Sequence, residues 1–309
     1  MTEDLHSIQN PFSGDQEKRA EIDKTSEKEI LMVSFGTSCE ESRREDIGGI
    51  ERALKETYPH WQVQSAFSNQ HIIDIIRIQT NTTIYNVDQA FREAVNKGVK
   101  YLVVQPTFLI GGIEYEKLKQ QVKLYEEQFL SLQLIEPLLE ENKQDKEKKT
   151  KRKADVAKIM ADEMMKEAGI STWEETREKK IAFILLGHGS YHYATVAYRD
   201  MEKIIQERGY ENMFLGLLEG EEEYTPEALL DKISEKGYTR IIMRPLMVSS
   251  GKHAYVDMAG EKKNSWLSLF KDSQKFEDIQ LQIKGMGRIK EIQQIYLHKI
   301  KDQIGAAVF

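Results

Sequence analysis

Residues 85–106 read YNVDQAFREAVNKGVKYLVVQP, and residues 224–245 read YTPEALLDKISEKGYTRIIMRP. The two segments align without a gap, and in both a helical pattern ends at a glycine and an apolar run ends at a proline. In the first copy the helical pattern covers residues 87–95 and the buried-strand pattern covers residues 101–106. The chain therefore contains an internal repeat whose unit is a helix followed by a strand.

A second pair of segments marks the beginning of each repeat. Residues 30–38 read ILMVSFGTS and residues 181–190 read IAFILLGHGS, and each is a short apolar run that stops at a turn containing glycine. On this pattern we align His188 with Thr37, so that the glycines before them also coincide.

Strand and helix patterns alternate along most of the chain. A helical spacing begins at residue 47, and a further strand pattern covers residues 61–67. This alternation is typical of a parallel sheet covered on both faces. We predict an α/β fold of two similar lobes, each a parallel sheet flanked by helices, which face each other across a cleft.

Composition divides the chain into four parts. The N-terminal stretch is polar and lacks periodicity, so we expect a flexible polar leader at 1–28. Residues 141–154, ENKQDKEKKTKRKA, are almost wholly charged or polar and must lie in water, as an exposed helix or as an interlobe linker. We predict an N-terminal α/β lobe at 29–140, a charged linker and helix at 141–179, and a C-terminal α/β lobe at 180–309.

The overall composition is that of a globular protein. The 309 residues are 40% hydrophobic, which is enough for buried cores, and the formal charge of -7 argues against a nucleic-acid-binding surface. No stretch reaches the roughly 18 apolar residues that a membrane span needs. The single cysteine, Cys39, allows no intramolecular disulfide and no Cys-x-x-Cys metal site. We expect a cytoplasmic protein without nucleic-acid or membrane partners, as a monomer or a homo-oligomer.

The repeat pairs two residues that can bind a metal. Glu114 stands eight residues beyond Pro106, and His253 stands eight residues beyond Pro245. Because the prolines coincide in the alignment, Glu114 and His253 are predicted to be structural equivalents.

Four polar residues follow predicted strand ends: Thr37, Glu114, His188 and His253. Ligands of open parallel sheets bind beyond the carboxyl ends of the strands, so we expect these residues at a shared opening. Two imidazoles and one carboxylate suit a first-row divalent metal and leave coordination positions open. The alternative for each histidine alone is a hydrogen-bonded loop residue without a ligand.

A polycarboxylate substrate would need basic and polar side chains near this opening, although each candidate could equally be an ordinary surface group. His192, four residues after His188, would share a helix face with it. The candidate substrate-binding residues are Thr37, Ser38, Arg43, Arg199, Lys252 and His192.

Other catalytic motifs are missing from the sequence. There is no Gly-x-Ser-x-Gly, no Gly-Lys-Ser/Thr phosphate loop, and no Gly-x-Gly-x-x-Gly after a strand. We predict no organic cofactor.

The chain resembles the anaerobic (class II) sirohydrochlorin cobaltochelatases of the chelatase superfamily from about residue 30 to its C-terminus. The matching motifs, in order, are Val33-Ser34-Phe35-Gly36-Thr37-Ser38, Glu114-Tyr115-Glu116-Lys117, Gly187-His188-Gly189, Pro245-Leu246-Met247, His253-Ala254, Asp257-Met258 and Ser265-Trp266.

The resemblance implies that His188 and His253 bind the metal and that Glu114 is the acidic residue of the same site. It also implies insertion of Co²⁺, the substrate metal, into sirohydrochlorin or its precorrin-2 form during anaerobic cobalamin biosynthesis. The macrocycle must lose two pyrrole protons, so we assign His188 as base and ligand and Glu114 as a second catalytic group. The alternatives are an iron or nickel chelatase of the same fold, or a non-catalytic tetrapyrrole or metal carrier.

Overall fold

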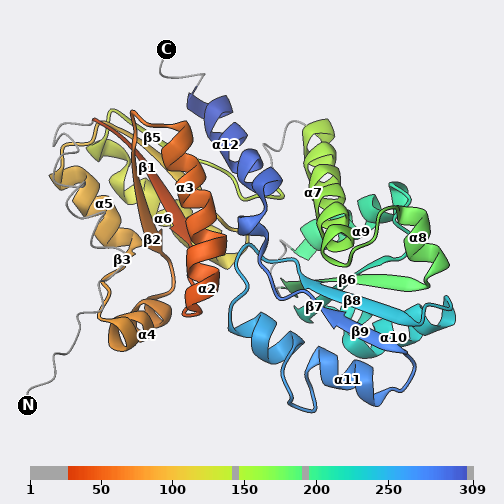
Figure 1. Cartoon of the computed structure of the whole chain (residues 1–309). Coiled ribbons are helices and arrows are strands. Elements are labelled where there is room, and N and C mark those ends of the chain that lie inside the picture. Colours follow the sequence, from red (N-terminus) through yellow and green to blue (C-terminus); the bar gives the residue numbers. More distant parts are fainter. Residues whose placement is uncertain (1–26, 141–145, 190–194, 305–309) are drawn as a thin grey trace, which may run out of the picture.

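The computed structural model describes residues 27–140, 146–189 and 195–304, and it contains two parallel sheets with helices on both faces (Figure 1). The first sheet has the strand order β3-β2-β1-β4-β5, and the second has the order β7-β6-β8-β9. The predicted α/β fold of two lobes is confirmed. The strands of the first sheet are β1 (Lys28–Ser34), β2 (Gln62–Phe67), β3 (Tyr85–Asn86), β4 (Tyr101–Pro106) and β5 (Ser131–Leu134), and those of the second are β6 (Ile181–Gly189), β7 (Met213–Glu219), β8 (Arg240–Pro245) and β9 (Asp278–Leu281).

Helices connect successive strands in each lobe, as parallel pairing requires. The first lobe contains α2 (Glu40–Ser42), the π-helical turn η1 (Arg43–Ile47), α3 (Gly48–Thr57), α4 (Gln70–Thr80), α5 (Val87–Asn96), α6 (Ile113–Tyr125) and η2 (Glu126–Gln128). The later helices are α7 (Lys146–Glu167), α8 (Trp173–Glu178), α9 (Val196–Glu207), η4 (Glu222–Tyr224), α10 (Pro226–Glu235), the π-helical turn η5 (His253–Met258), α11 (Trp266–Asp272), η6 (Met286–Arg288) and α12 (Lys290–Ile304).

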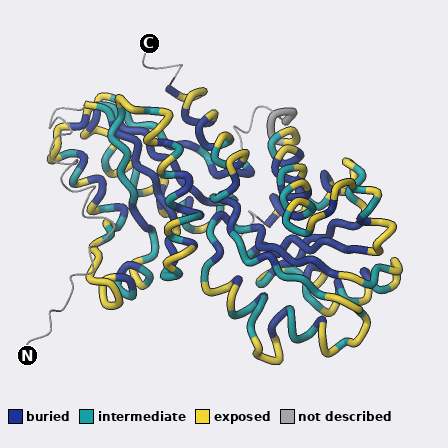
Figure 2. Tube along the Cα trace, viewed as in Figure 1, coloured by how far each residue is buried: buried dark blue, intermediate teal, exposed yellow. Residues whose placement is uncertain are grey.

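The central strands are buried on both faces, which explains their continuous apolar runs. In β1, Ile30 and Met32 face one apolar core, whereas Leu31 and Val33 face another. All four side chains are fully buried. Figure 2 shows burial following the strands of both sheets, with the exposed residues on the outer helices and turns.

The structure confirms the repeat over residues 85–106 and 224–245. Helices α5 and α10 begin and end at matching positions of the alignment, and so do strands β4 and β8. Each of the two helices is followed by a glycine with a left-handed backbone, Gly98 at φ +75° and Gly237 at φ +79°.

The alignment of His188 with Thr37 is wrong by two residues. In the sheets, Val33 lies opposite Pro106, and Leu186 lies opposite Pro245, the matching proline of the repeat. Counting two residues onward makes Phe35 the structural counterpart of His188.

The glycines explain this error. The matching left-handed glycines are Gly36 at φ +98° and Gly189 at φ +80°. Gly187 is required for a different reason, because a Cβ there would lie 2.7 Å from the ring of Tyr198. A sequence pattern cannot separate a glycine needed for its backbone angle from one needed for space.

The last helix of each repeat packs on the other lobe. Helix α7 follows the first sheet but lies on the second, where the side-chain amide of Gln282 donates to the Met164 carbonyl at 2.9 Å. Helix α12 follows the second sheet but contacts α3 and β4, and the Tyr58 hydroxyl donates to the Leu297 carbonyl at 2.8 Å (Figure 1). The predicted lobe boundaries did not include this return of the chain to the first lobe.

The structure describes only part of the predicted leader and of the predicted charged linker. The leader lies outside them except for its last two residues, and residues 141–145 of the charged linker lie outside as well. Within the described part of the chain, no helix is long and apolar enough to cross a membrane.

Glu29, in β1, gives the stability of the protein a pH dependence. Its side chain is fully buried, neither carboxylate oxygen has a partner among the described residues, and burial raises its pKa to about 7 from 4.5. The folded state therefore binds a proton that the unfolded state releases. The proton on Glu29 contributes fully to the free energy of unfolding below pH 4.5. As the pH rises through 7 this contribution, roughly 3 kcal/mol, is lost.

We expect Glu29→Gln to remove this loss and to stabilise the protein more at pH 8 than at pH 5. Urea unfolding across that pH range measures the difference. The exposed residue Glu56 provides the control, and Glu56→Gln should leave the pH profile as in the parent. Parallel profiles for Glu29→Gln and the parent would contradict the assignment.

Candidate functional site

Two histidines lie side by side in the second lobe, one near the end of strand β6 and one in the segment that follows the adjacent strand β8. His188 is the penultimate residue of β6, and His253 begins η5, which follows β8. Their ring centroids are 4.6 Å apart and the ring planes are inclined at 88°. The sheet thus joins two side chains that are separated by 65 residues in the sequence.

Hydrogen bonds determine which nitrogen of each ring is free. The Nδ1 of His253 lies 2.7 Å from the Asp257 carboxylate, and the Nδ1 of His188 lies 3.3 Å from the Gly189 carbonyl. Both partners can only accept, so each neutral ring carries its proton on Nδ1. Among the described residues, no hydrogen bond is made by either Nε2, so both lone pairs are available to a ligand, as in metal sites with a supporting carboxylate or carbonyl.

The backbone around His188 is tightly packed. A Cβ at Gly189 would lie 1.7 Å from the Glu219 carbonyl oxygen, and a Cβ at Gly187 would lie 2.7 Å from the ring of buried Tyr198. Neither glycine beside His188 could therefore carry a side chain in this packing. This close approach of neighbouring elements positions His188 at the strand end.

Glu114 does not join the two histidines in this structure. It lies in the first turn of α6, and its carboxylate accepts a hydrogen bond from the Lys117 ammonium at 2.8 Å. Among the described residues, no group of three or more His, Cys, Asp or Glu side chains is arranged to hold a metal ion. The equivalence of Glu114 and His253 does agree with the repeat, because both residues stand at the start of a helical segment.

Thr37 and Ser38 lie where the two lobes meet. Thr37 is buried, and its Oγ1 accepts from the Cys39 backbone N–H at 3.2 Å. A Cβ at Gly251 would be 3.1 Å from that oxygen, so Thr37 packs against the loop that leads to His253. Ser38 is half-buried. The loop after β1 therefore faces the loop after β8.

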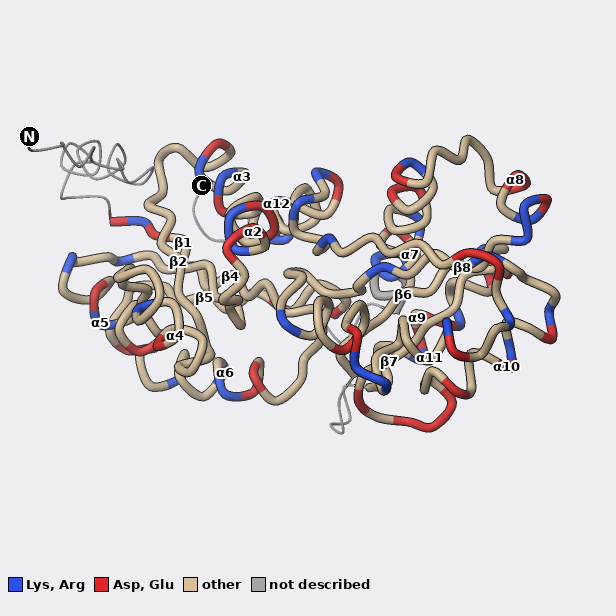
Figure 3. The backbone as a smooth tube through the Cα atoms, turned by 60° about the horizontal axis from the view of Figure 1, so that its bottom comes forward, with Lys and Arg blue, Asp and Glu red and all other residues tan. Residues whose placement is uncertain are grey.

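The basic candidates differ in their surroundings. Arg199 forms two hydrogen bonds to the Glu221 carboxylate, one of them at 2.8 Å from Nε, so its charge is largely compensated. Lys252 is exposed beside His253, and Arg43 is half-buried in η1. Lysine, arginine and acidic residues are interspersed over both lobes (Figure 3). His192 lies outside the described residues.

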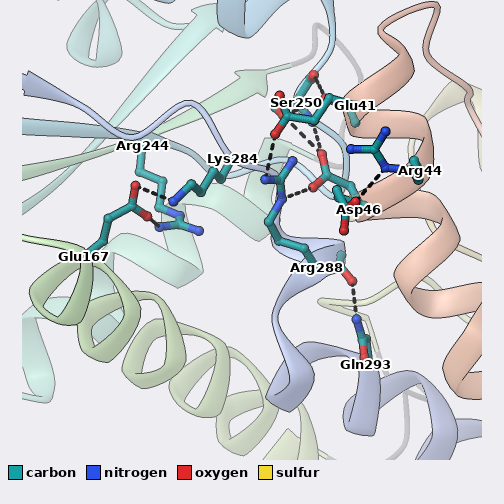
Figure 4. Close-up of polar contacts among 12 residues, drawn as sticks. Glu41, Arg44, Asp46, Glu167, Arg244, Ser250, Lys284, Arg288 and Gln293 are labelled. Atoms are coloured by element: carbon teal, nitrogen blue, oxygen red, sulfur yellow. Dashed lines mark hydrogen bonds and ion pairs between the residues drawn. The ribbon is translucent and has the colours of Figure 1, made fainter.

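Sequence reasoning missed a buried polar network next to this site (Figure 4). The Asp46 carboxylate is fully buried and accepts from the backbone N–H of Ser250 at 2.9 Å, from its hydroxyl at 3.1 Å, and from Arg288 Nε at 2.5 Å. These residues come from distant parts of the chain and match no motif. The role of Asp257 had a detectable signal, its spacing of four residues from His253.

Large apolar side chains are exposed on the connections that follow the central strands. Each of these side chains is between 37% and 57% exposed. A ligand that covers them binds more favourably, because their apolar surface is removed from water. Both lobes contribute to the set, which comprises Phe35, Ile113, Val196 and Tyr255.

Comparison with known proteins identifies the family to which the chain is similar. The family model described as cobalt chelatase (CbiK) matches residues 28–305. The sirohydrochlorin cobaltochelatase of Salmonella typhimurium is 27% identical over 243 residues, covering 79% of this chain and 84% of the relative. The sirohydrochlorin cobaltochelatase CbiKC of Nitratidesulfovibrio vulgaris is 22% identical over 246 residues, covering 78% of each.

Solved structures share the fold. SirB from Bacillus subtilis with Fe³⁺ superposes with a TM-score of 0.61 at 13% identity, covering 91% of this chain and 98% of that one. The sirohydrochlorin chelatase SirB from Bacillus subtilis subspecies spizizenii, in complex with cobalt, has a TM-score of 0.56 at 10% identity, covering 91% and 96%.

Asp257 provides a test of the imidazole pair. We expect Asp257→Ala to weaken Co²⁺ binding by the full chain about 10- to 100-fold, because the His253 ring loses the acceptor that orients it. Titration with Co²⁺ measures the affinity. Asp74→Ala, which removes an exposed carboxylate paired with Arg77 on α4, should leave the affinity unchanged. Equal affinities for Asp257→Ala and the parent would show that this hydrogen bond does not orient a metal ligand.

Proposed function

The chain belongs to the cobalt chelatase (CbiK) family, and on that premise we propose that it inserts Co²⁺ into sirohydrochlorin or its precorrin-2 form, with His188 and His253 as the metal-binding residues. The observation that carries this proposal is the pair of adjacent imidazoles whose Nδ1 atoms face acceptors and whose Nε2 atoms are left for a metal. The relatives named as sirohydrochlorin cobaltochelatases support the choice of metal and macrocycle.

Metal insertion requires the macrocycle to lose two pyrrole protons as one divalent ion enters. Neutral imidazole nitrogens bind first-row metals well enough to collect Co²⁺ and leave open positions for exchange. When Co²⁺ leaves Nε2 of His188 for the macrocycle, the same lone pair becomes free to accept a pyrrole proton. His188 therefore acts first as ligand and then as base, while His253 holds the metal beside it.

Glu114 is assigned to the second proton and to the third metal position. Its carboxylate is paired with Lys117, which lies one helical turn further along α6 and is exposed. An exposed pair of this kind contributes on the order of 0.5 kcal/mol, so a divalent ion can readily compete with Lys117 for Glu114. The proposal requires this exchange when substrate binds.

The surroundings suit a flat macrocycle with carboxylates at its rim. The exposed apolar residues on the strand connections, defined above, can cover the ring faces. Lys252 and Arg43 are available to pair with rim carboxylates, whereas Arg199 would first have to leave Glu221. Thr37, Ser38 and His192 remain proposed substrate contacts. One copy of the chain supplies both imidazoles, so the proposal needs neither a second subunit nor an organic cofactor.

We expect His188→Ala to lower the rate of Co²⁺ insertion into sirohydrochlorin at least about 100-fold, since it removes both a ligand and the base. The absorbance change of the macrocycle measures the rate, with Fe²⁺ and Ni²⁺ in parallel reactions. His71→Ala, on the exposed start of α4, is the matched control and should react like the parent. A parent that binds both substrates without accelerating insertion would be a carrier, and faster insertion of Fe²⁺ or Ni²⁺ would change the assigned metal.

Glu114 has a matched control on the same helix. Glu116 pairs with Lys119 at the same spacing and at 2.6 Å, as Glu114 pairs with Lys117. We expect Glu114→Gln to lower kcat about 100-fold and Glu116→Gln to change it less than two-fold. If both variants react alike in steady-state assays, Glu114 has no special part in the reaction.

A further inference from the structure

We propose that Asp46 is a positioning residue for His253, acting from the first lobe through Ser250. This inference rests on the proposed function, because it concerns the metal-binding role of His253. Asp46 lies in η1 of the first lobe, and Ser250 lies in the loop between β8 and η5 of the second, three residues before His253.

All the polar groups of Ser250 bond to the first lobe. Its backbone N–H and its hydroxyl both donate to Oδ2 of Asp46, at 2.9 Å and 3.1 Å, and its carbonyl accepts from the Ser42 hydroxyl. Ser42, Asp46 and Ser250 are fully buried, so water cannot replace these bonds without opening the interface. The backbone before His253 is thus fastened to the opposite lobe.

The same loop is held on its other side by the chain segment that returns to the first lobe. The backbone N–H of Met286 donates to the Met247 carbonyl, and that of Gly287 donates to the Val248 carbonyl, both at 2.9 Å. Arg288, next in this segment, donates from Nε to Asp46 (Figure 4). Asp46 is therefore the group at which the loop and the returning segment converge.

A packing contact adds to this attachment. A Cβ at Gly251, two residues before His253, would lie 3.1 Å from the Oγ1 of Thr37, so the loop also packs against the first lobe there. Asp257 sets the orientation of the His253 ring, whereas Asp46 sets the position of its backbone. The distance between His253 and the end of β6, which carries His188, consequently depends on a carboxylate from the other lobe.

A second network of ion pairs holds the returning segment but does not bond to the loop before His253. Lys284, four residues before Arg288, donates to Glu167 at 2.8 Å, and Glu167 also accepts from the buried Arg244 at 2.9 Å (Figure 4). None of these three residues bonds to the loop from β8 to η5 in the described contacts. This network joins the returning segment to α7 and to strand β8.

Ser250→Ala tests the proposal with little risk to folding, because it keeps the backbone bond to Asp46 and the pairing of Asp46 with Arg288. We expect the dissociation constant of Co²⁺, titrated into the full chain without tetrapyrrole, to rise about ten-fold, near the lower end of losses for groups that support metal ligands. The visible absorption spectrum of bound Co²⁺ should change, and KM for Co²⁺ should rise while KM for sirohydrochlorin stays the same. Asp46→Asn should have the same effects, and larger.

Ser65→Ala is the matched control, since the Ser65 hydroxyl donates to the Glu51 carboxylate at 2.8 Å within the first lobe. It removes the same kind of bond and should leave the Co²⁺ affinity and spectrum unchanged. If Ser250→Ala binds Co²⁺ with the affinity and spectrum of the parent, Asp46 does not position His253, and the proposed function is not affected. If His253→Ala instead binds Co²⁺ as the parent does, the proposed function fails, and the positioning role fails with it.

Discussion

The buried carboxylate of Asp46 constrains the structure more than any other single group described above. A charged group that is fully removed from water costs several kcal/mol unless its oxygens are bonded, and here the partners come from the second lobe and from the segment between the lobes. The compensation is complete only when both lobes and this segment are correctly placed. Removing one partner would leave an uncompensated charge, so the relative position of the lobes is strongly specified.

The lobes are also held in place because the last helix of each repeat packs on the other lobe. Helix α7 lies on the second sheet and α12 on the first, and one continuous apolar core includes residues from both helices and both sheets. The two lobes are therefore not independent bodies joined by a flexible linker. Each lobe depends on the other copy of the repeat for a covering helix, and the polar network lies where the returning chain passes between them.

The two copies of the repeat carry different side chains at equivalent positions. The second lobe carries His188 and His253 at the ends of adjacent strands, and the first lobe carries Phe35 and Glu114 at the equivalent positions. Two imidazoles suit a metal, whereas an exposed aromatic ring and a carboxylate suit the face and the protons of a macrocycle. A duplicated unit can thus supply the metal from one side and receive the tetrapyrrole from the other.

Local pattern was sufficient to predict strands β1, β2, β4, β6 and β8, helices α3, α5 and α10, and the repeat, because periodicity and helix stops depend on near neighbours. The motifs likewise identified the family. The shorter or outer strands β3, β5, β7 and β9 were not predicted. Several other features were not predicted. They are the structural equivalence of His188 and Phe35, the return of α12 to the first lobe, the ion pair of Arg199 with Glu221, the available Nε2 atoms and the Asp46 network. Each depends on distances between residues far apart in the chain, and only packing determines those distances.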